Sequence, residues 1–360
     1  MKNLSKTFAL LMIPAFLITS CGGNKTEDSK ESKPEKKVNA ELEKQIDALA
    51  ACEQQNTNCD AYTKTSEYIQ AECKDEKKRE AIVADLFTLI EKGPSNKTQA
   101  AAHAVNFWTM GSEFRKNAEY GTIVLNALKK EKDEEGNYAG SQLGQLLASW
   151  YTTEDKKLFT SILNTVKSGN TELRGRLELI RLCPSEALAN SDLFHAFATM
   201  INNSEEKLEV RVQCLNIIWR VENEDMKASA RTTYETFIAD SEIQIAGSSM
   251  LGLGYLKSFA SYELIEKTLL EKKDDQNWCY YGSYCLSELV RSVPDSLDLN
   301  KVLALTKTLI TNKNVTAYYR SYYVYTLISL NTPGAKALLN QLKSGGEKEI
   351  VDEINNQMKK

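Results

Sequence analysis

The side chains that could perform chemistry in this sequence are few: eight cysteines and two histidines among 360 residues. Nucleophilic catalysis and zinc binding both draw on thiolates and imidazoles at suitable spacing. No Cys-x-x-Cys pair occurs, and no histidine accompanies a cysteine as a ligand partner. His103 lies among alanines and His195 between two phenylalanines, so we interpret both as packing or surface residues. The sequence therefore predicts no metal, no cofactor, no catalytic residue and no enzymatic activity.

A second distinctive group is aromatic and recurs along the chain. Three tyrosines of one predicted repeat reappear with the same spacing in the next. Tyrosine combines a large contact area with low rotamer entropy and a polar tip, and it is common at recognition surfaces. Two interpretations stay open: the rings fill an interface between helices, or their exposed members bind a protein or glycan. The candidate binding residues are Trp278, Tyr280, Tyr281, Tyr284, Tyr318, Tyr319 and Tyr322.

The N-terminus has the pattern of an export signal. Lys2 and Lys6 precede an apolar run from Phe8 to Ile18, which is too short to span a bilayer. The following segment, Leu17-Ile18-Thr19-Ser20-Cys21, resembles the lipobox of bacterial lipoproteins. The resemblance implies that residues 1–20 are a signal peptide and that Cys21 becomes the acylated N-terminus, anchored in a membrane.

The segment after Cys21 is strongly polar. Residues 22–37 hold five lysines, four acidic residues and no apolar side chain. Such a composition cannot bury enough surface to offset its ordering entropy, so we expect residues 21–38 to form a lipidated, disordered tether. The lipoprotein resemblance, with Gly22 rather than aspartate after the cysteine, implies residence in the outer membrane, facing the periplasm or the cell surface.

The overall charge argues against nucleic acid as a partner. Lys+Arg number 45 and Asp+Glu 49, a net charge of −4, and loss of Lys2 and Lys6 with the signal peptide takes this to −6. Phosphate binding needs a concentrated basic surface instead. We therefore expect contact with the membrane through the lipid and with a protein partner in the envelope.

Two cysteines are suited to a disulfide. Cys52 and Cys59 flank a polar segment between an expected helix at 41–51 and another from Asp60 onward. The cell envelope is oxidising, and a bridge across a short turn between helices is geometrically easy. The sequence predicts a Cys52–Cys59 bridge, and it predicts buried, unpaired thiols at Cys183, Cys214, Cys279 and Cys285.

From about residue 39, apolar residues recur at spacings of three and four, which indicates amphipathic helices. The apolar face at 82–90 ends at Gly93-Pro94, the face at 158–166 ends before Gly169, and Thr332-Pro333 has the form of a helix start. No alternating run bounded by hairpin-turn residues appears. The predicted fold class is all-α.

These helices recur as pairs with a period of about 33–38 residues. The first helices of successive pairs begin near Leu173, Val210, Ile243, Trp278 and Thr316, and small residues such as Gly247 and Gly282 lie early in them, where close packing needs them. The openings are similar to HEAT-type repeats over residues 80–345. Arg174 and Arg211 match the arginine position of that family, whereas Ile245 and Tyr280 fall near it in later repeats.

The HEAT resemblance implies an α-solenoid of stacked helical hairpins at 79–360, preceded by capping helices at 39–78. We therefore predict a membrane-anchored envelope lipoprotein that acts as a non-catalytic interaction scaffold or adaptor. Two alternatives stay open: a structural subunit of an envelope assembly, and an all-α enzyme acting on glycans.

Overall fold

The computed structural model describes residues 37–52, 58–134, 138–291 and 297–359. The chain divides into two units, Met1–Lys37 and Val38–Lys360, and all the described helices belong to the second. The predicted signal peptide, Cys21 and nearly all of the tether lie outside the described residues.

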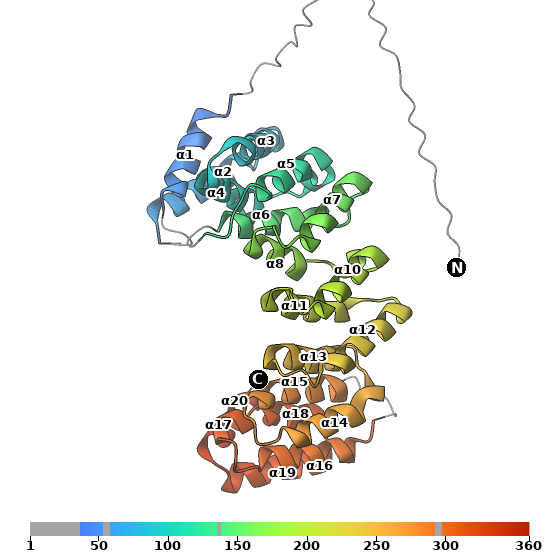
Figure 1. The fold of residues 1–360 in the computed structure, drawn as a ribbon. Helices are drawn as coiled ribbons and strands as arrows, with labels where there is room; N and C mark the ends of the chain where they lie inside the picture. The colour runs from blue at the N-terminus through green and yellow to red at the C-terminus, as the bar shows by residue number, and fades with distance from the viewer. Residues whose placement is uncertain (1–36, 53–57, 135–137, 292–296, 360) are drawn as a thin grey trace, which may run out of the picture. The chain divides into compact units, whose positions relative to one another are not determined.

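All regular structure in these ranges is helical, and no strand occurs in them, which confirms the all-α prediction. Most helices form successive hairpins (Figure 1). The first helices of these hairpins are α3 (Glu76–Lys92), α5 (Ala118–Leu128), α7 (Lys156–Lys167), α10 (Ser191–Asn202), α12 (Glu224–Phe237), α14 (Tyr262–Glu271), α16 (Leu299–Ile310) and α19 (Pro333–Gly345). The second helices are α4 (Ser95–Phe107), α6 (Ala139–Leu147), α8 (Leu173–Arg181), α11 (Leu208–Leu215), α13 (Ile243–Tyr255), α15 (Asn277–Arg291), α18 (Tyr323–Leu330) and α20 (Lys348–Gln357).

The remaining elements lie outside the hairpins or connect their helices. The helices among them are α1 (Ala40–Ala50), α2 (Asp60–Glu72), α9 (Ser185–Leu188) and α17 (Ala317–Arg320). The 3₁₀ turns are η1 (Glu113–Lys116), η2 (Ala148–Trp150), η3 (Ile218–Arg220) and η4 (Phe259–Ser261).

Each hairpin stacks on the next, so that the helices form two layers (Figure 1). The second helices pack most closely: α6 lies on α8, α13 on α15 and α15 on α18. The five helices that the sequence analysis placed at the start of each repeat belong to this layer, so the hairpin boundary falls one helix earlier than predicted. Because the pairs repeat, the choice of boundary leaves the periodicity unchanged.

Glycines permit the closest approach within this layer. A Cβ on Gly144 of α6 would lie 2.7 Å from the Cα of Gly175 on α8, and a Cβ on Gly175 would lie 2.7 Å from the carbonyl oxygen of Gly140. The backbones of the two helices are therefore in direct contact. In α13, Gly247 leaves the space that the Tyr281 ring occupies, as expected for a small residue there.

A recurring arginine links two successive helices in three of the hairpins. Arg176, Arg211 and Arg320 are each the fourth residue of their helix, and each donates to the carbonyl of the residue ten positions earlier, at the end of the preceding helix. The prediction of Arg211 at this position agrees with the structure, but that of Arg174 was wrong. Positions two apart on a helix differ by about 200° around the axis, and Arg174 lies 4.2 Å from the Tyr138 ring instead.

Two of these arginines also form an ion pair with a glutamate of the next hairpin. Arg176 is buried and bonds both carboxylate oxygens of Glu206, at 2.9 and 2.5 Å, in the loop before α11. Arg320 makes the equivalent ion pair with Glu347, directly before α20. The guanidinium therefore connects three backbone segments that belong to two consecutive repeats.

The N-terminal helices α1 and α2 pack on α4 and α3 respectively. A disulfide joins Cys52 to Cys59 between them, with the Cα atoms 6.3 Å apart. The unpaired cysteines of the described residues are all buried: Cys73, Cys183, Cys214, Cys279 and Cys285. At the other end of the chain, the Thr332 hydroxyl accepts from the Ala335 amide with Pro333 in the first turn, as predicted.

Candidate functional site

The structure brings the predicted aromatic residues together where α15 packs on α17 and α18. Tyr280 lies 5.7 Å from Tyr322, and Tyr284 stacks on Tyr325 at 5.6 Å, measured between ring centroids. Tyr318 lies 6.2 Å from Tyr322. We call this group the tyrosine surface; its members are Tyr280, Tyr284, Tyr318, Tyr322 and Tyr325.

The register of these contacts differs from the predicted one. The sequence pattern aligns Tyr280 with Tyr318 and Tyr284 with Tyr322, whereas the rings observed beside them are Tyr322 and Tyr325 respectively. The reason is that α15 is one continuous helix, while its counterpart is divided into α17 and α18 by a turn. Because of this turn, the rings of α15 lie beside tyrosines three or four positions later in the sequence than the pattern predicts. Tyr325, which was not among the candidate residues, therefore joins the group.

Exposure separates the candidates into two groups. Tyr280 and Tyr318 are 43% and 60% exposed, while Tyr284 and Tyr322 are half-buried. Trp278 is only 4% exposed and belongs to the core, which corrects its assignment to a binding surface. Tyr281 and Tyr319 are also half-buried against the core. We assign Tyr281 and Tyr319 to packing, because their rings contact the hydrophobic core.

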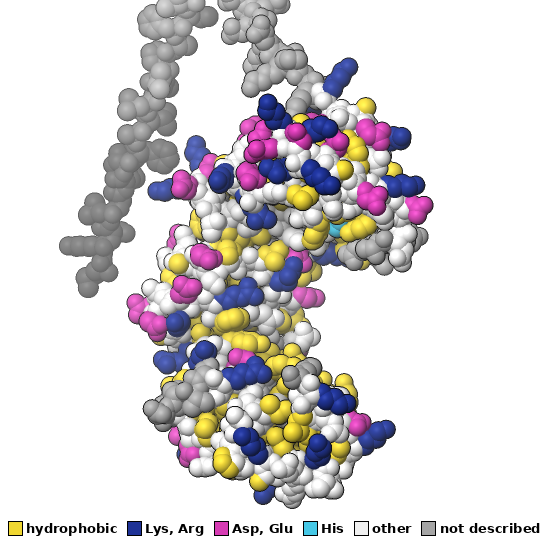
Figure 2. Space-filling model, turned by 180° about the vertical axis from the view of Figure 1, so that it is seen from behind, with side chains coloured by type: hydrophobic (Ala, Val, Ile, Leu, Met, Phe, Trp, Pro, Cys, Tyr) yellow, Lys and Arg dark blue, Asp and Glu magenta, His cyan; other side chains and the backbone are white. Residues whose placement is uncertain are grey.

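The tyrosine surface continues onto the preceding repeat. Trp219 of η3 and Tyr255 of α13 stack with ring centroids 4.8 Å apart, and Tyr255 is 37% exposed. Burial raises the pKa of Tyr255, and the nearby Tyr280 and Tyr284 add to this rise. Figure 2 shows hydrophobic side chains, a class that includes tyrosine, gathered over the middle and C-terminal parts of the array.

The hydroxyl groups of this surface are uncharged hydrogen-bonding groups. The hydrogen bond with Tyr318, followed by burial, raises the pKa of Tyr322 to about 12. Burial raises the pKa of Tyr325 as well, and its hydroxyl accepts from Gln357 Nε2 at 2.8 Å. A surface of neutral rings with polar tips suits contacts that combine apolar area with hydrogen bonds.

The histidines lie elsewhere. His103 is surrounded by the rings of Tyr62, Phe107 and Trp108, at 5.6, 4.7 and 4.9 Å, and burial lowers its pKa. His195 is exposed on α10. The positions agree with packing and surface roles, and the two imidazoles belong to different repeats.

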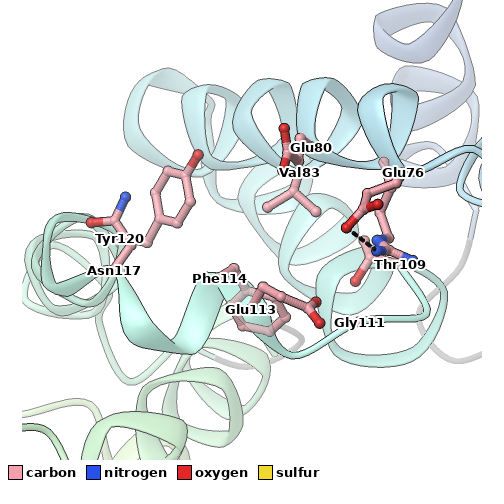
Figure 3. Close-up of a pocket in the computed structure, with 10 residues that line it drawn as sticks. Glu76, Glu80, Val83, Thr109, Gly111, Glu113, Phe114, Asn117 and Tyr120 are labelled. Carbon is pink, nitrogen blue, oxygen red and sulfur yellow. Dashed lines mark ion pairs between the residues drawn. The ribbon is translucent and has the colours of Figure 1, made fainter.

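A pocket of about 220 Å³ lies between α3 and the η1–α5 segment (Figure 3). Its walls combine Val83, Phe114 and Tyr120 with carboxylates, and Arg79 pairs with Glu76 at 3.8 Å. This volume is below the range of about 300–1,000 Å³ that encloses a drug-sized ligand, so the tyrosine surface is the stronger candidate.

Membrane spans and metal clusters are both absent from the described residues. None of the helices in those ranges has an apolar stretch long enough to cross a bilayer. No group of three or more histidine, cysteine, aspartate or glutamate side chains in the described part of the chain is arranged to hold a metal ion.

Comparison with known proteins identifies the fold. No protein-family model matches the sequence, and no curated protein matches it. Among solved structures, a mutant of Kap121p, a karyopherin of the HEAT/ARM type, is similar over 89% of this chain with a TM-score of 0.52 and 13% identity. This chain spans 37% of the length of that one. The likeness shows an all-α helical-repeat fold of the HEAT type and nothing about activity.

Proposed function

We propose that this protein is a non-catalytic interaction scaffold, held at the bacterial envelope by a lipid on Cys21, which binds a protein partner through the tyrosine surface. The observation that carries the proposal is the pair of exposed rings, Tyr280 and Tyr318, on a repeat array. Helical repeats commonly offer extended binding surfaces.

Energetic reasoning supports these two positions. Interfaces owe most of their binding free energy to a few residues, with tyrosine among the enriched types. Tyr280 and Tyr318 are held in place by neighbouring rings, with Tyr284 4.7 Å from Tyr280 and Tyr319 5.2 Å from Tyr318. A preordered ring loses little side-chain entropy on binding, so more of its contact energy appears as affinity.

The binding part is tested by photo-cross-linking in cells. A photoreactive phenylalanine analogue replaces Tyr280 or Tyr318, with the same analogue at Leu270, which is 40% exposed on α14, as the matched control. We expect adducts from the two tyrosine positions and none from Leu270. A single adduct in stoichiometric yield would indicate a structural subunit and several adducts an adaptor; no adduct at either tyrosine would refute the proposal.

A mutational test separates binding from folding. Tyr280→Ala with Tyr318→Ala is expected to weaken binding of the captured partner by about 2–4 kcal/mol, roughly 30- to 1,000-fold. Because both side chains are exposed, the free energy of unfolding should change by about 1 kcal/mol or less. Equal losses of stability and binding would show that the rings are structural.

The anchoring part has its own test. Cys21→Ser removes the predicted acylation site, so a labelled fatty acid fed to the cells should mark the unmodified chain and not the variant. The variant should also leave the membrane fraction for the soluble fraction. If both proteins carry label, or both stay in the membrane, the lipoprotein interpretation fails while the tyrosine-surface test is unaffected.

A further inference from the structure

A basic pocket lies where the first half of α12 meets the turn between α13 and α14. Its volume is about 310 Å³. Lys227 and Arg231 line it from α12, and Lys257 lines it from the turn. One hairpin, α12 with α13, and the turn that follows it therefore contribute positive charge to one cavity in a chain whose net charge is −4.

The positive charge is only partly balanced. Glu224 is the acidic residue that lines the pocket, and it pairs with Lys227 at 2.7 Å. Its side chain is 84% exposed, so water screens the pair. Arg231 is half-buried and, among the described residues, neither it nor Lys257 makes an ion pair. Charged groups withdrawn from water usually have a partner.

The acid one helical turn away from Arg231 makes no ion pair with it among the described residues. Glu235, one helical turn further along α12, accepts a hydrogen bond from Ser261 Oγ at 2.6 Å. Since the Ser261 proton goes to Glu235, the 2.7 Å bond between Ser258 and Ser261 uses the Ser258 proton. Ser258 thus offers the pocket an acceptor only, and the donors available to a ligand are the basic side chains.

The backbone at Lys257 is held in an unusual conformation. Its φ is 54°, in the left-handed region where glycine is the favoured residue. Its amide donates to the Gly254 carbonyl at 3.0 Å, which ends α13. This conformation puts a lysine at the edge of the cavity. The adjacent Leu256 and Phe259 supply an apolar wall.

We propose that this pocket binds a phosphate-bearing group, either a soluble phosphate ester or the headgroup of an anionic lipid. A guanidinium presents a rigid fork of donors that matches phosphate oxygens, and two ammonium groups add positive charge. The cavity is larger than inorganic phosphate requires, so its apolar wall accommodates the carbon part of an ester. None of the five members of the tyrosine surface lines this pocket, and the proposal does not depend on the function proposed for that surface.

The test uses the full chain carrying Cys21→Ser, so that an N-terminal lipid does not itself insert into vesicles. Calorimetry measures the affinity for glycerol 3-phosphate, and sedimentation compares phosphatidylcholine vesicles with and without phosphatidylglycerol. Arg231→Gln with Lys257→Gln should weaken binding at least about tenfold. The matched control Lys272→Gln, at the exposed end of α14, should change it by less than about twofold.

Each outcome decides the proposal. Binding of glycerol 3-phosphate that the double variant loses supports a soluble ester, and binding confined to phosphatidylglycerol vesicles supports a lipid headgroup. The proposal is overturned if the parent chain binds neither, or if Lys272→Gln weakens binding as much as the double variant. Circular dichroism and the melting temperature of the double variant confirm that it is folded; if it is not, Arg231→Lys, which keeps the charge and loses the fork, should still weaken binding.

Discussion

The contact between the backbones of α6 and α8 allows a sharp test of the repeat packing. Gly144→Ala places a Cβ 2.7 Å from the Cα of Gly175 and 2.8 Å from its carbonyl carbon. These are backbone atoms, so no side chain can rotate to relieve the clash. One helix must move away by about 1 Å, which separates the apolar side chains on both sides of the contact.

The expected magnitude is a difference between two effects. Replacing a glycine inside a helix by alanine stabilises it by about 1 kcal/mol. Overpacking costs about 1–3 kcal/mol, and a clash between two backbones belongs at the upper end. We therefore expect Gly144→Ala to lower the free energy of unfolding by about 2 kcal/mol, which corresponds to a fall in Tm of about 4 °C.

Gly345→Ala is the matched control. Gly345 is also helical, in the last turn of α19, but its Cβ would meet no atom within 4 Å. This variant should be stabilised by about 0.5–1 kcal/mol. Urea denaturation and thermal melting measure both. If Gly144→Ala is as stable as the unmodified chain, or if Gly345→Ala loses as much stability, the inferred backbone contact is wrong.

Four further outcomes are expected. Arg176→Met should reduce the free energy of unfolding by about 3–5 kcal/mol in urea titrations, because it leaves the Glu206 carboxylate without its buried partner; a loss below about 1 kcal/mol would contradict this. Burial raises the pKa of Glu206, but the hydrogen bonds from Arg176 outweigh it and the net pKa lies below 4.5; the stability from this pair is therefore present above about pH 4.5 and lost as the pH falls through the lower folded pKa. Glu206→Gln should make melting temperatures less sensitive to acid, and an unchanged pH profile would refute the assignment. Burial raises the pKa of Cys183 to about 12, so maleimide should modify this thiol only in urea, and mass spectrometry of the native protein should find it unlabelled. Tyr281→Ala should lower Tm more than Tyr280→Ala, because the Tyr281 ring packs on α13 whereas Tyr280 is 43% exposed; the reverse order would show that burial has been assigned to the wrong ring.

Local signals in the sequence were sufficient for the helices. The end of α3 at Gly93-Pro94 and the start of α19 at Thr332-Pro333 depend on backbone rules that act within a few residues. The spacing of apolar residues indicated the fold class and the recurrence of helix pairs, since a helix must bury its apolar face wherever it packs. The resemblance to HEAT repeats followed from the same pattern.

Predictions for single residues were wrong where they depended on the rotation of a helix about its axis or on the register between two neighbouring helices. Alignment of the short sequence motif places Arg174 at the arginine position of the HEAT family, whereas the residue that reaches the preceding helix, Arg176, is set by where α8 begins. The recurrence of the tyrosines likewise could not reveal the turn between α17 and α18 that brings Tyr284 onto Tyr325.

A series of amphipathic helices in a repeating order could be predicted from the residues alone, because helix formation and amphipathic patterning are local. Which rings face solvent became clear only from the packing of the repeats, which buries Trp278 and leaves Tyr280, on the same helix, exposed. The packing also placed Arg231 of α12 and Lys257, in the turn after α13, around one cavity. The physical reason is that exposure depends on the neighbouring repeat, whose rotation and distance are set by backbone contacts such as that between Gly144 and Gly175.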